Sequence, residues 1–296
     1  MIKENMHKAY SIANELLRDK LKEEAPDILA DLDDINESDV IVTVGQHDRI
    51  ESVFSKVNTP HNLIHPEQLR GLRLDPDQIV FVNCPGNFDD TGLRKLNRFV
   101  KDGGFLFTTD WALKHVLERA FPGYVRYNNQ STTDEVVRVE VLSGDDPFLN
   151  SILGPDDDPQ WWLEGSSYPI EILKKDEVEV LVTSREIKEK YGEAPVFITI
   201  NYGKGRIYHM ISHFYLQRAE TRTKRHSLKG SEYLKEKNIS GNAAFSKYQD
   251  MGIDGENLGD IEAAYSSSAM LNKILYEKKR AIRRNEKGKQ KPGGNE

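Results

Sequence analysis

Residues 78–120 contain two successive places where a short apolar strand leads into a helix. The first strand covers residues 79–82 and the second covers residues 105–109. Such crossings are typical of a parallel sheet, whose carboxyl edge carries the functional side chains of many α/β enzymes. The second crossing is a sharp turn, which favours exposure of one side chain at that edge. It offers Asp110 and Trp111 but neither a cysteine nor a serine.

The alternation of strand and helix extends on both sides of this segment. Short apolar runs predict strands at residues 40–44, 62–64, 79–82 and 105–109, and helical spacing of apolar residues predicts helices at residues 5–24, 50–57 and 261–284. Short buried strands that alternate with helices indicate a parallel sheet with helices on both faces. The sequence therefore predicts a flavodoxin-like, three-layer α/β fold with a β insertion at the edge of the sheet.

The expected organisation is one large α/β domain with flanking segments. The predicted parts are an N-terminal helix with an acidic loop (1–37), the α/β domain (38–285), a β-rich insertion (124–184), a long charged loop (218–260) and a disordered basic tail (286–296). The insertion begins where the strand pattern changes to alternation, which favours antiparallel strands. A glycine-bearing turn at residues 201–205 predicts a hairpin.

Composition limits the class of protein. Cys84 is the only cysteine among 296 residues, so the chain forms no internal disulfide. No apolar run approaches the roughly 20 residues that span a bilayer, and the first residues carry charges where a signal peptide needs a hydrophobic run. We therefore expect a cytoplasmic protein without a membrane segment. No dinucleotide fingerprint or phosphate-binding loop occurs in the sequence, so no cofactor is predicted.

Charge is unevenly distributed along the chain. The formal net charge is -7, yet basic residues collect at 218–229 and 273–291. Arg218 and Arg222 follow the last predicted strand and are expected to give a cleft a positive rim, suited to an anionic ligand; the alternative is a charged surface loop. The basic tail favours either nucleic-acid contact or a solvated helix end.

An aromatic segment at residues 161–169 lies inside the insertion. It contains Trp162 and Tyr168 beside the carboxylate of Glu164. Such a cluster either lines a ligand cleft together with Trp111 or caps the hydrophobic core. Both interpretations remain open at the level of sequence.

The order of these motifs resembles that of the class I glutamine amidotransferase-like superfamily. The quoted elements are Cys84-Pro85-Gly86 after a strand, the turn at Asp110, and the run from Gly203 to His213. The closer similarity is to trehalose-utilisation-type and related domains that lack amidotransferase activity. The resemblance implies that Pro85 and Gly86 help to form an oxyanion pocket and that His213 is the histidine after a late strand. At the position of the nucleophilic cysteine, however, this chain has Asp110 or Trp111.

The missing cysteine argues against amide transfer, because that reaction needs an activated thiolate. Cys84 lies one crossing earlier and is expected to behave as a small buried hydrophobe. Asp110 has two interpretations, a carboxylate base near His213 or the N-cap of the following helix. His209 and His213 are expected on one face of a strand, but nothing nearby predicts a metal site.

Two classes of function follow. The first is a non-catalytic binding or scaffolding protein that recognises a small anionic ligand or a partner protein. The second is a hydrolase-like enzyme that uses Asp110 and His213 for acid and base chemistry. Nucleic-acid binding by the basic tail is a weaker third possibility, and no pattern indicates an oligomeric state. The candidate ligand-binding residues are Cys84, Pro85, Gly86, Trp111, Trp162, Glu164, Tyr168, Arg218 and Arg222.

Overall fold

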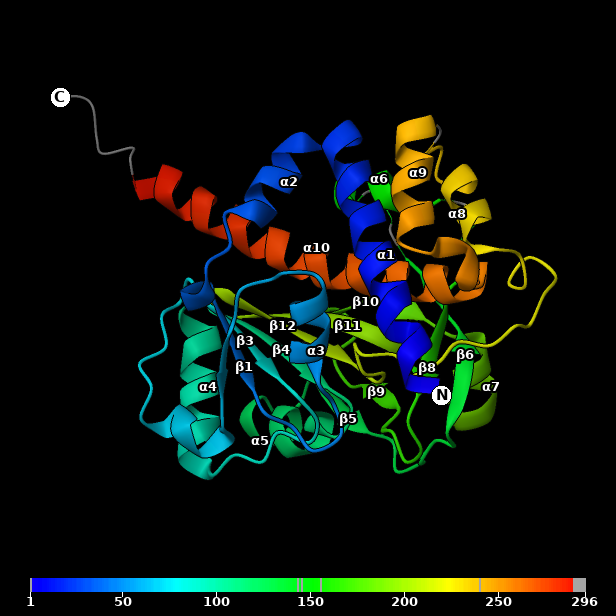
Figure 1. The fold of residues 1–296 in the computed structure, drawn as a ribbon. Helices are drawn as coiled ribbons and strands as arrows, with labels where there is room; N and C mark the ends of the chain where they lie inside the picture. Colours follow the sequence, from blue (N-terminus) through cyan, green and yellow to red (C-terminus); the bar gives the residue numbers. More distant parts are fainter. Residues whose placement is uncertain (1, 143, 145, 155, 240, 290–296) are drawn as a thin grey trace.

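A single large sheet organises the molecule (Figure 1). The computed structural model describes residues 2–142, 144, 146–154, 156–239 and 241–289. The sheet has eight strands in the order β2-β1-β3-β4-β12-β11-β10-β7. Their bounds are β1 Val40–Thr43, β2 Asn62–Ile64, β3 Ile79–Val82, β4 Phe105–Thr109, β7 Glu140–Val141, β10 Val178–Thr183, β11 Pro195–Tyr202 and β12 Gly205–Met210.

The first five strands of this order run parallel, and the last three continue the sheet in antiparallel pairs. The parallel part follows the 2-1-3-4-5 order of flavodoxin-like folds, with β12 as the fifth strand. The flavodoxin-like prediction is therefore confirmed. The hairpin prediction at residues 201–205 is also confirmed, because Tyr202 pairs with Gly205 at the bend between β11 and β12.

Helices cover both faces of the sheet (Figure 1). Helices α1, α3 and α10 lie on one face, and α4 and α5 lie on the other. The helices are α1 Ile2–Glu24, α2 Pro26–Asp33, α3 Ile50–Lys56, α4 Asp90–Asp102, α5 Glu118–Ala120, α6 Pro147–Ile152, α7 Arg185–Tyr191, α8 Gly230–Glu236, α9 Asn242–Asp250 and α10 Leu258–Lys289.

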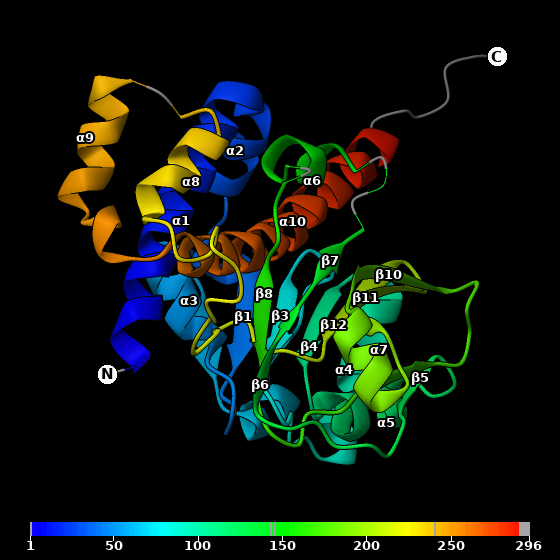
Figure 2. The same cartoon turned by 90° about the vertical axis from the view of Figure 1, so that its right-hand side faces the viewer.

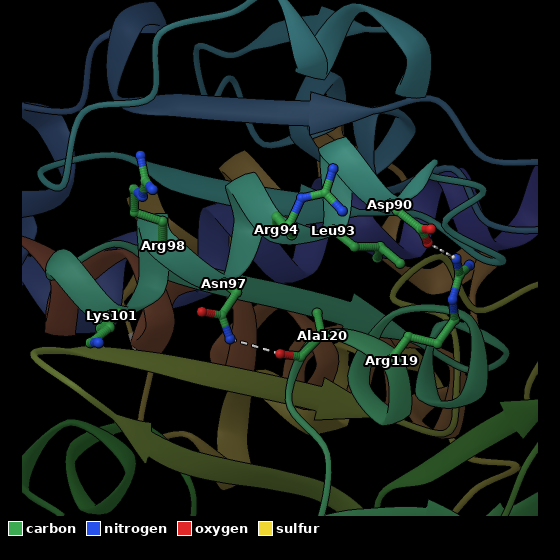
Figure 3. Close-up of a pocket in the computed structure, with 8 residues that line it drawn as sticks. All are labelled: Asp90, Leu93, Arg94, Asn97, Arg98, Lys101, Arg119 and Ala120. Atoms are coloured by element: carbon green, nitrogen blue, oxygen red, sulfur yellow. Dashed lines mark hydrogen bonds and ion pairs between the residues drawn. The ribbon is translucent and has the colours of Figure 1, made fainter.

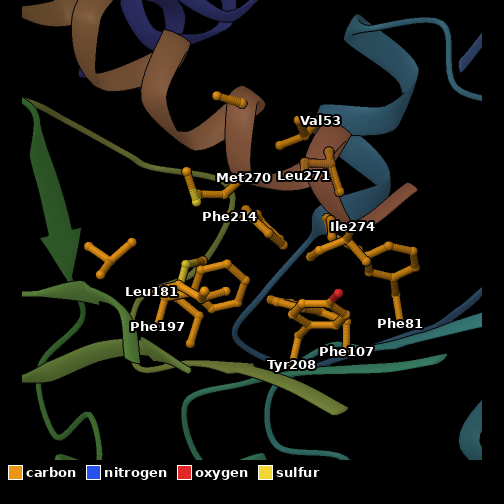
Figure 4. Close-up of a cluster of buried hydrophobic side chains, with 14 of the residues drawn as sticks. Val53, Phe81, Phe107, Leu181, Phe197, Tyr208, Phe214, Met270, Leu271 and Ile274 are labelled. Carbon is orange, nitrogen blue, oxygen red and sulfur yellow. The ribbon is translucent and has the colours of Figure 1, made fainter. Parts of the chain in front are cut away.

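The core lies mainly between the sheet and α10 (Figure 4). Successive side chains along a strand point to opposite faces, and residues that pair across neighbouring strands share a face. Phe81 pairs with Phe107, Phe107 with Tyr208, and Tyr208 with Thr199, two residues from Phe197, so the rings of Phe81, Phe107 and Phe197 lie on the same side. Phe214 stacks on Phe107 with ring centroids 4.5 Å apart, and Ile274 comes down from α10. On the opposite face, α4 buries its apolar stripe, which consists of Leu93, Leu96, Phe99 and Val100.

The segment at residues 124–184 forms antiparallel pairs, as predicted. Strands β5 (Val125–Tyr127) and β9 (Ile170–Ile172) pair with each other, and β6 (Glu135–Arg138) pairs with β8 (Gln160–Leu163). Figure 2 shows β6 and β8 beside the main sheet, near α7. Strands β7 and β10 extend the antiparallel edge of that sheet, so the insertion is continuous with it.

Three segments differ from the sequence predictions. The predicted acidic loop contains α2, whose Ile28 and Leu32 are buried. The predicted long loop at 218–260 contains α8 and α9, and Tyr233 and Leu234 of α8 are fully buried. Helix α10 continues to Lys289, so the disordered tail does not begin at residue 286; the remainder of that prediction, residues 290–296, lies outside the described residues.

Candidate functional site

The carboxyl ends of four neighbouring parallel strands bring ionisable side chains together. Asp48 follows β1, Cys84 follows β3, Asp110 follows β4 and His213 follows β12. One ligand atom from each of Cys84, Asp110 and His213 lies within 4.8 Å of the others, and these residues are at most 2% exposed. Neighbouring parallel strands end at the same edge, which explains why positions far apart in sequence meet. We call these three residues the edge cluster.

Asp110 occupies the sharp turn that the sequence predicts. Its φ of 45° is unusual for a residue with a side chain. Its carboxylate is not exposed, however, because it accepts hydrogen bonds from the Ser167 hydroxyl (3.0 Å) and the Tyr168 backbone N–H (2.9 Å). The interpretation of Asp110 as an N-cap is wrong, because the following helical turn (Leu113–Leu117) receives no side-chain cap bond.

His213 lies between two carboxylates. Its Nε2 is 3.5 Å from Oδ2 of Asp110, and its Nδ1 is 3.4 Å from Oε2 of Glu164. The expectation that His209 and His213 share a strand face is wrong, because β12 ends at Met210. His209 remains inside the strand, where its Nδ1 is 2.8 Å from the Thr108 hydroxyl.

The protonation states of the edge cluster are set by burial and by each other. Burial acts to lower the pKa of His213, but Asp48, Asp110 and Cys84 together outweigh it and raise the pKa well above 6.5. Burial raises the pKa of Asp110, which the contact with His213 partly offsets. Because carboxylates face the imidazole, the protonated form of His213 is favoured. The imidazole therefore carries a proton at neutral pH and is poorly suited to act as a general base.

Cys84 is fully buried, and burial raises the pKa of its thiol to about 11. A thiol with that pKa is a poor nucleophile at neutral pH. Two residues later, Gly86 has a φ of 72°, and a Cβ there would lie 2.7 Å from Val116 Cγ2 and 2.8 Å from Val82 Cγ1. Pro85 and Gly86 are both buried, so the described turn is packed into the protein interior.

A short loop of the insertion closes over Asp110. We call residues 164–168 the cover loop. The indole N–H of Trp111 donates to the Ser166 carbonyl (2.7 Å), and Trp111 stacks on Tyr168 with centroids 5.6 Å apart. Tyr168 in turn stacks on Tyr127 at 3.9 Å. Glu164 begins the loop, so its contact with His213 links the insertion to the sheet.

Trp162 lies deeper than the cover loop. Its side chain is buried, its indole N–H donates to Asp134 (2.9 Å), and its ring meets His213 edge-on at 5.8 Å. Of the two interpretations of the aromatic segment, this position supports a cap on the core. Trp111 and Tyr168 are only partly buried and form the outer surface of the closed site.

The predicted positive rim is not formed. Arg218 pairs with Asp134 at 2.7 Å. Arg222 pairs with Glu186 at 2.7 Å and with Glu220 at 3.1 Å. Both guanidinium groups therefore have their charge compensated by nearby carboxylates.

A basic cavity lies along the outer side of α4, away from the edge cluster. It has a volume of about 760 Å³ and is lined by Arg94, Arg98, Lys101 and Arg119, with Asp90 as its one carboxylate (Figure 3). We call it the α4 groove. Sequence reasoning missed it by following only the apolar side of α4. The signal was present, since Arg94, Arg98 and Lys101 recur at intervals of four and three residues on the opposite side.

Two of the four cations in the α4 groove are uncommitted. Arg119 pairs with Asp90 at 2.8 Å, and Arg94 donates to the Thr91 hydroxyl. The charged groups of Arg98 and Lys101 form no hydrogen bond or ion pair with any residue that the structure describes. An anion entering the groove would therefore meet cations that need not give up an existing partner.

Comparisons with known proteins give only distant similarities. No family model and no curated protein matches this chain. Among solved structures, a ThuA-like protein from Bacteroides uniformis is 12% identical over 60% of this chain and 81% of its own, with a TM-score of 0.41. A cytoplasmic protein from Salmonella typhimurium is 12% identical over 60% and 88%, with a TM-score of 0.42.

Gan42B, a GH42 β-galactosidase from G. stearothermophilus, is 13% identical over 58% of this chain, with a TM-score of 0.39. The chain spans only 27% of the length of that enzyme. All three TM-scores are below 0.5, so these similarities decide neither the family nor the activity of this chain. Among the helices that the structure describes, none has the length and apolar character to cross a membrane.

Proposed function

We propose that this chain is a non-catalytic, amidotransferase-like binding protein that recognises a small anionic ligand in the α4 groove. The observation that carries the proposal is a cavity of about 760 Å³ with four basic side chains and one carboxylate. The formal charge of the whole chain is -7, so the groove is a local exception to the overall charge. Arginine suits such a site because its planar guanidinium donates two parallel hydrogen bonds to carboxylate or phosphate.

The size of the groove favours a small molecule over a protein surface. Small-molecule sites are usually clefts of about 300–1,000 Å³, and the groove falls within this range. Arg98 and Lys101 supply free charges, and Asn97 adds a polar group whose side chain donates to the Ala120 carbonyl (2.7 Å) and the Tyr202 hydroxyl (2.9 Å). A partner protein with an acidic segment remains the alternative occupant.

The absence of catalysis is inferred from the state of the edge cluster. Both carboxylate oxygens of Asp110 accept hydrogen bonds from the cover loop, and His213 is held as an imidazolium. Cys84 is buried as a thiol. A substrate would have to displace the cover loop before it reached any of these groups.

Isothermal titration calorimetry with inorganic pyrophosphate tests the proposal. The double variant Arg98→Glu/Lys101→Glu should bind at least about tenfold more weakly than the unmodified protein, since each charge-assisted hydrogen bond contributes about 1.5–3 kcal/mol. The double variant Lys22→Glu/Lys56→Glu makes the same change of charge at exposed positions of α1 and α3, so it is the matched control and should leave binding unchanged. Equal affinity of both variants would contradict the proposal, as would an affinity that is insensitive to salt.

One observation favours the second candidate function, a hydrolase-like enzyme. Asp110 lies 3.5 Å from His213 on a backbone turn with positive φ, which is how an elbow presents a reacting group. In such an enzyme, Asp110 and His213 would perform the acid and base steps. Hydrolysis of activated esters or amides that disappears in Asp110→Asn would support this reading, whereas equal turnover by the variant would remove it.

A further inference from the structure

We propose that Cys84, Asp110 and His213 bind a Zn²⁺ ion at the carboxyl edge of the sheet. This goes beyond the proposed function, because the edge cluster and the α4 groove are separate sites. The three ligand atoms lie within 4.8 Å of one another, and all three side chains are buried. They come from the ends of β3, β4 and β12, so the ion would join three neighbouring strands.

The spacing of the ligand atoms suits a tetrahedral ion. Zinc binds imidazole nitrogen and carboxylate oxygen at about 2.0–2.2 Å, which places two such ligand atoms about 3.3–3.5 Å apart in a tetrahedron. Nε2 of His213 and Oδ2 of Asp110 are 3.5 Å apart. The sulfur of Cys84, within 4.8 Å of both, needs a side-chain shift of only about 1 Å to complete the set.

The second observation is a buried histidine that lacks a well-formed hydrogen bond. His213 is 2% exposed, yet neither ring nitrogen makes a hydrogen bond of acceptable geometry to the described residues. Buried polar atoms nearly always have a partner, and an exception needs a cause. An ion bound at Nε2 would give that nitrogen a partner, and the carboxylate of Glu164 lies beside Nδ1, at 3.4 Å.

The surroundings of the three ligands match the outer shell of metal sites. Ligating histidines usually present their other nitrogen to a carboxylate, and ligating carboxylates are themselves hydrogen-bonded. Glu164 is placed 3.4 Å from Nδ1 of His213, and Ser167 and Tyr168 donate to Asp110. The cover loop therefore holds the ligands from outside.

The local charge is compatible with a cation. The carboxylates of Asp110 and Glu164 lie within 3.5 Å of the His213 imidazole, and Oδ2 of the buried Asp48 has no hydrogen-bond partner among the described residues. Zinc would bind with release of the proton of the imidazolium and the proton of the Cys84 thiol, so the divalent ion takes the place of two protons beside these carboxylates.

The mixture of ligand atoms selects the metal. Magnesium and calcium prefer oxygen ligands, whereas a thiolate, an imidazole and a carboxylate together suit zinc. Three protein ligands leave one position for a water molecule. The ion would stabilise the closed arrangement of the strand ends and the cover loop.

Cobalt substitution tests the proposal on the full chain. The protein is treated with a chelator, dialysed and titrated with Co²⁺, which replaces zinc and has visible absorption bands. One equivalent should bind and give a near-ultraviolet thiolate-to-cobalt band, which Zn²⁺ then removes by displacing the cobalt. Because Cys84 is the only cysteine, this band identifies its ligand even without a variant. Absence of the band at one equivalent of Co²⁺ would overturn the proposal.

Variants then separate direct ligands from their surroundings. Cys84→Ser should abolish the band, and Glu164→Gln, at a partly exposed position, should weaken zinc affinity about 10–100-fold while keeping the band. His226→Gln is the matched control, because His226 is also buried beside carboxylates, Asp158 and Glu262, but has no cysteine near it. Zinc binding that survives in Cys84→Ser at full affinity, or that is lost equally in His226→Gln, would refute the assignment.

Discussion

The carboxyl edge of the sheet and the α4 groove differ in almost every physical respect. The edge cluster is buried, has the carboxylate of Glu164 beside its own Asp110, and is closed by the cover loop. The α4 groove is open, rich in cations and formed by exposed side chains of α4 and the facing Arg119. The edge where an α/β fold usually carries its reactive groups is here an interior site, whereas the accessible charge lies on a helix surface.

The largest expected effect is a loss of protein stability when His213 of the edge cluster is replaced. In metal-free protein, His213→Gln removes the one cation among buried carboxylates, and we expect a loss of about 3 to 5 kcal/mol in the free energy of unfolding. Urea denaturation measures it. His115→Gln, at a half-buried position outside the cluster, should change stability by less than about 0.5 kcal/mol. A loss below about 1 kcal/mol in His213→Gln would show that the cluster is not electrostatically coupled.

The next largest loss of stability is expected from a change in the packing around Gly86. Gly86→Ala should destabilise the protein by about 1 to 3 kcal/mol more than Gly123→Ala, because only the first places a Cβ against other atoms. Both glycines have positive φ, 72° and 87°, but nothing lies within 4 Å of a Cβ at Gly123. The control therefore isolates the backbone cost, which is about 1 to 2 kcal/mol. Equal losses would mean that the Gly86 turn is loosely packed.

A smaller effect on stability is expected from His209, which is neutral in the folded protein, unlike the protonated His213. Burial lowers the pKa of His209 to about 3, so the folded protein keeps it neutral while the unfolded chain takes up a proton below pH 6.5. Its contribution to stability is present above pH 6.5 and is lost as the pH falls toward 3, by about 1.4 kcal/mol per pH unit. Denaturation of the unmodified protein and His209→Gln between pH 7 and 5 measures the difference. A parallel pH dependence in both proteins would contradict the prediction.

The smallest stability change is expected in the α4 groove. Arg98→Ala and Lys101→Ala should each alter the free energy of unfolding by less than about 0.5 kcal/mol, since neither side chain has an ionic partner among the described residues. Both should nevertheless weaken pyrophosphate binding. A marked loss of stability would instead assign these cations a structural role, which thermal denaturation of the two variants would reveal.

Sequence patterns predicted the central sheet well because most of its strands are short and apolar. Strands β2 and β3 begin and end where the sequence predicts. Helices α2 and α8 were missed because their apolar residues are few, and each is stabilised by contacts with α10 that no local pattern reveals. Tertiary contacts of this kind override weak local propensity.

The site was predictable only in part. The order of strands brings Asp110 and His213 to one edge, as the sequence suggests. The contact between His213 and Glu164 joins the sheet to the insertion and could not be derived from spacing. The pairing of Arg222 with Glu186 is likewise a contact between distant segments, so the arginines looked free in the sequence when they are not.

Hydrogen exchange with and without inorganic pyrophosphate tests the central claim most directly, because it reports on both regions in one experiment. We predict slower exchange in peptides that cover α4 and Arg119, and no change in the cover loop or at Asp110. Protection confined to the cover loop and the edge cluster, with α4 unaffected, would contradict the account and place ligand recognition at the carboxyl edge.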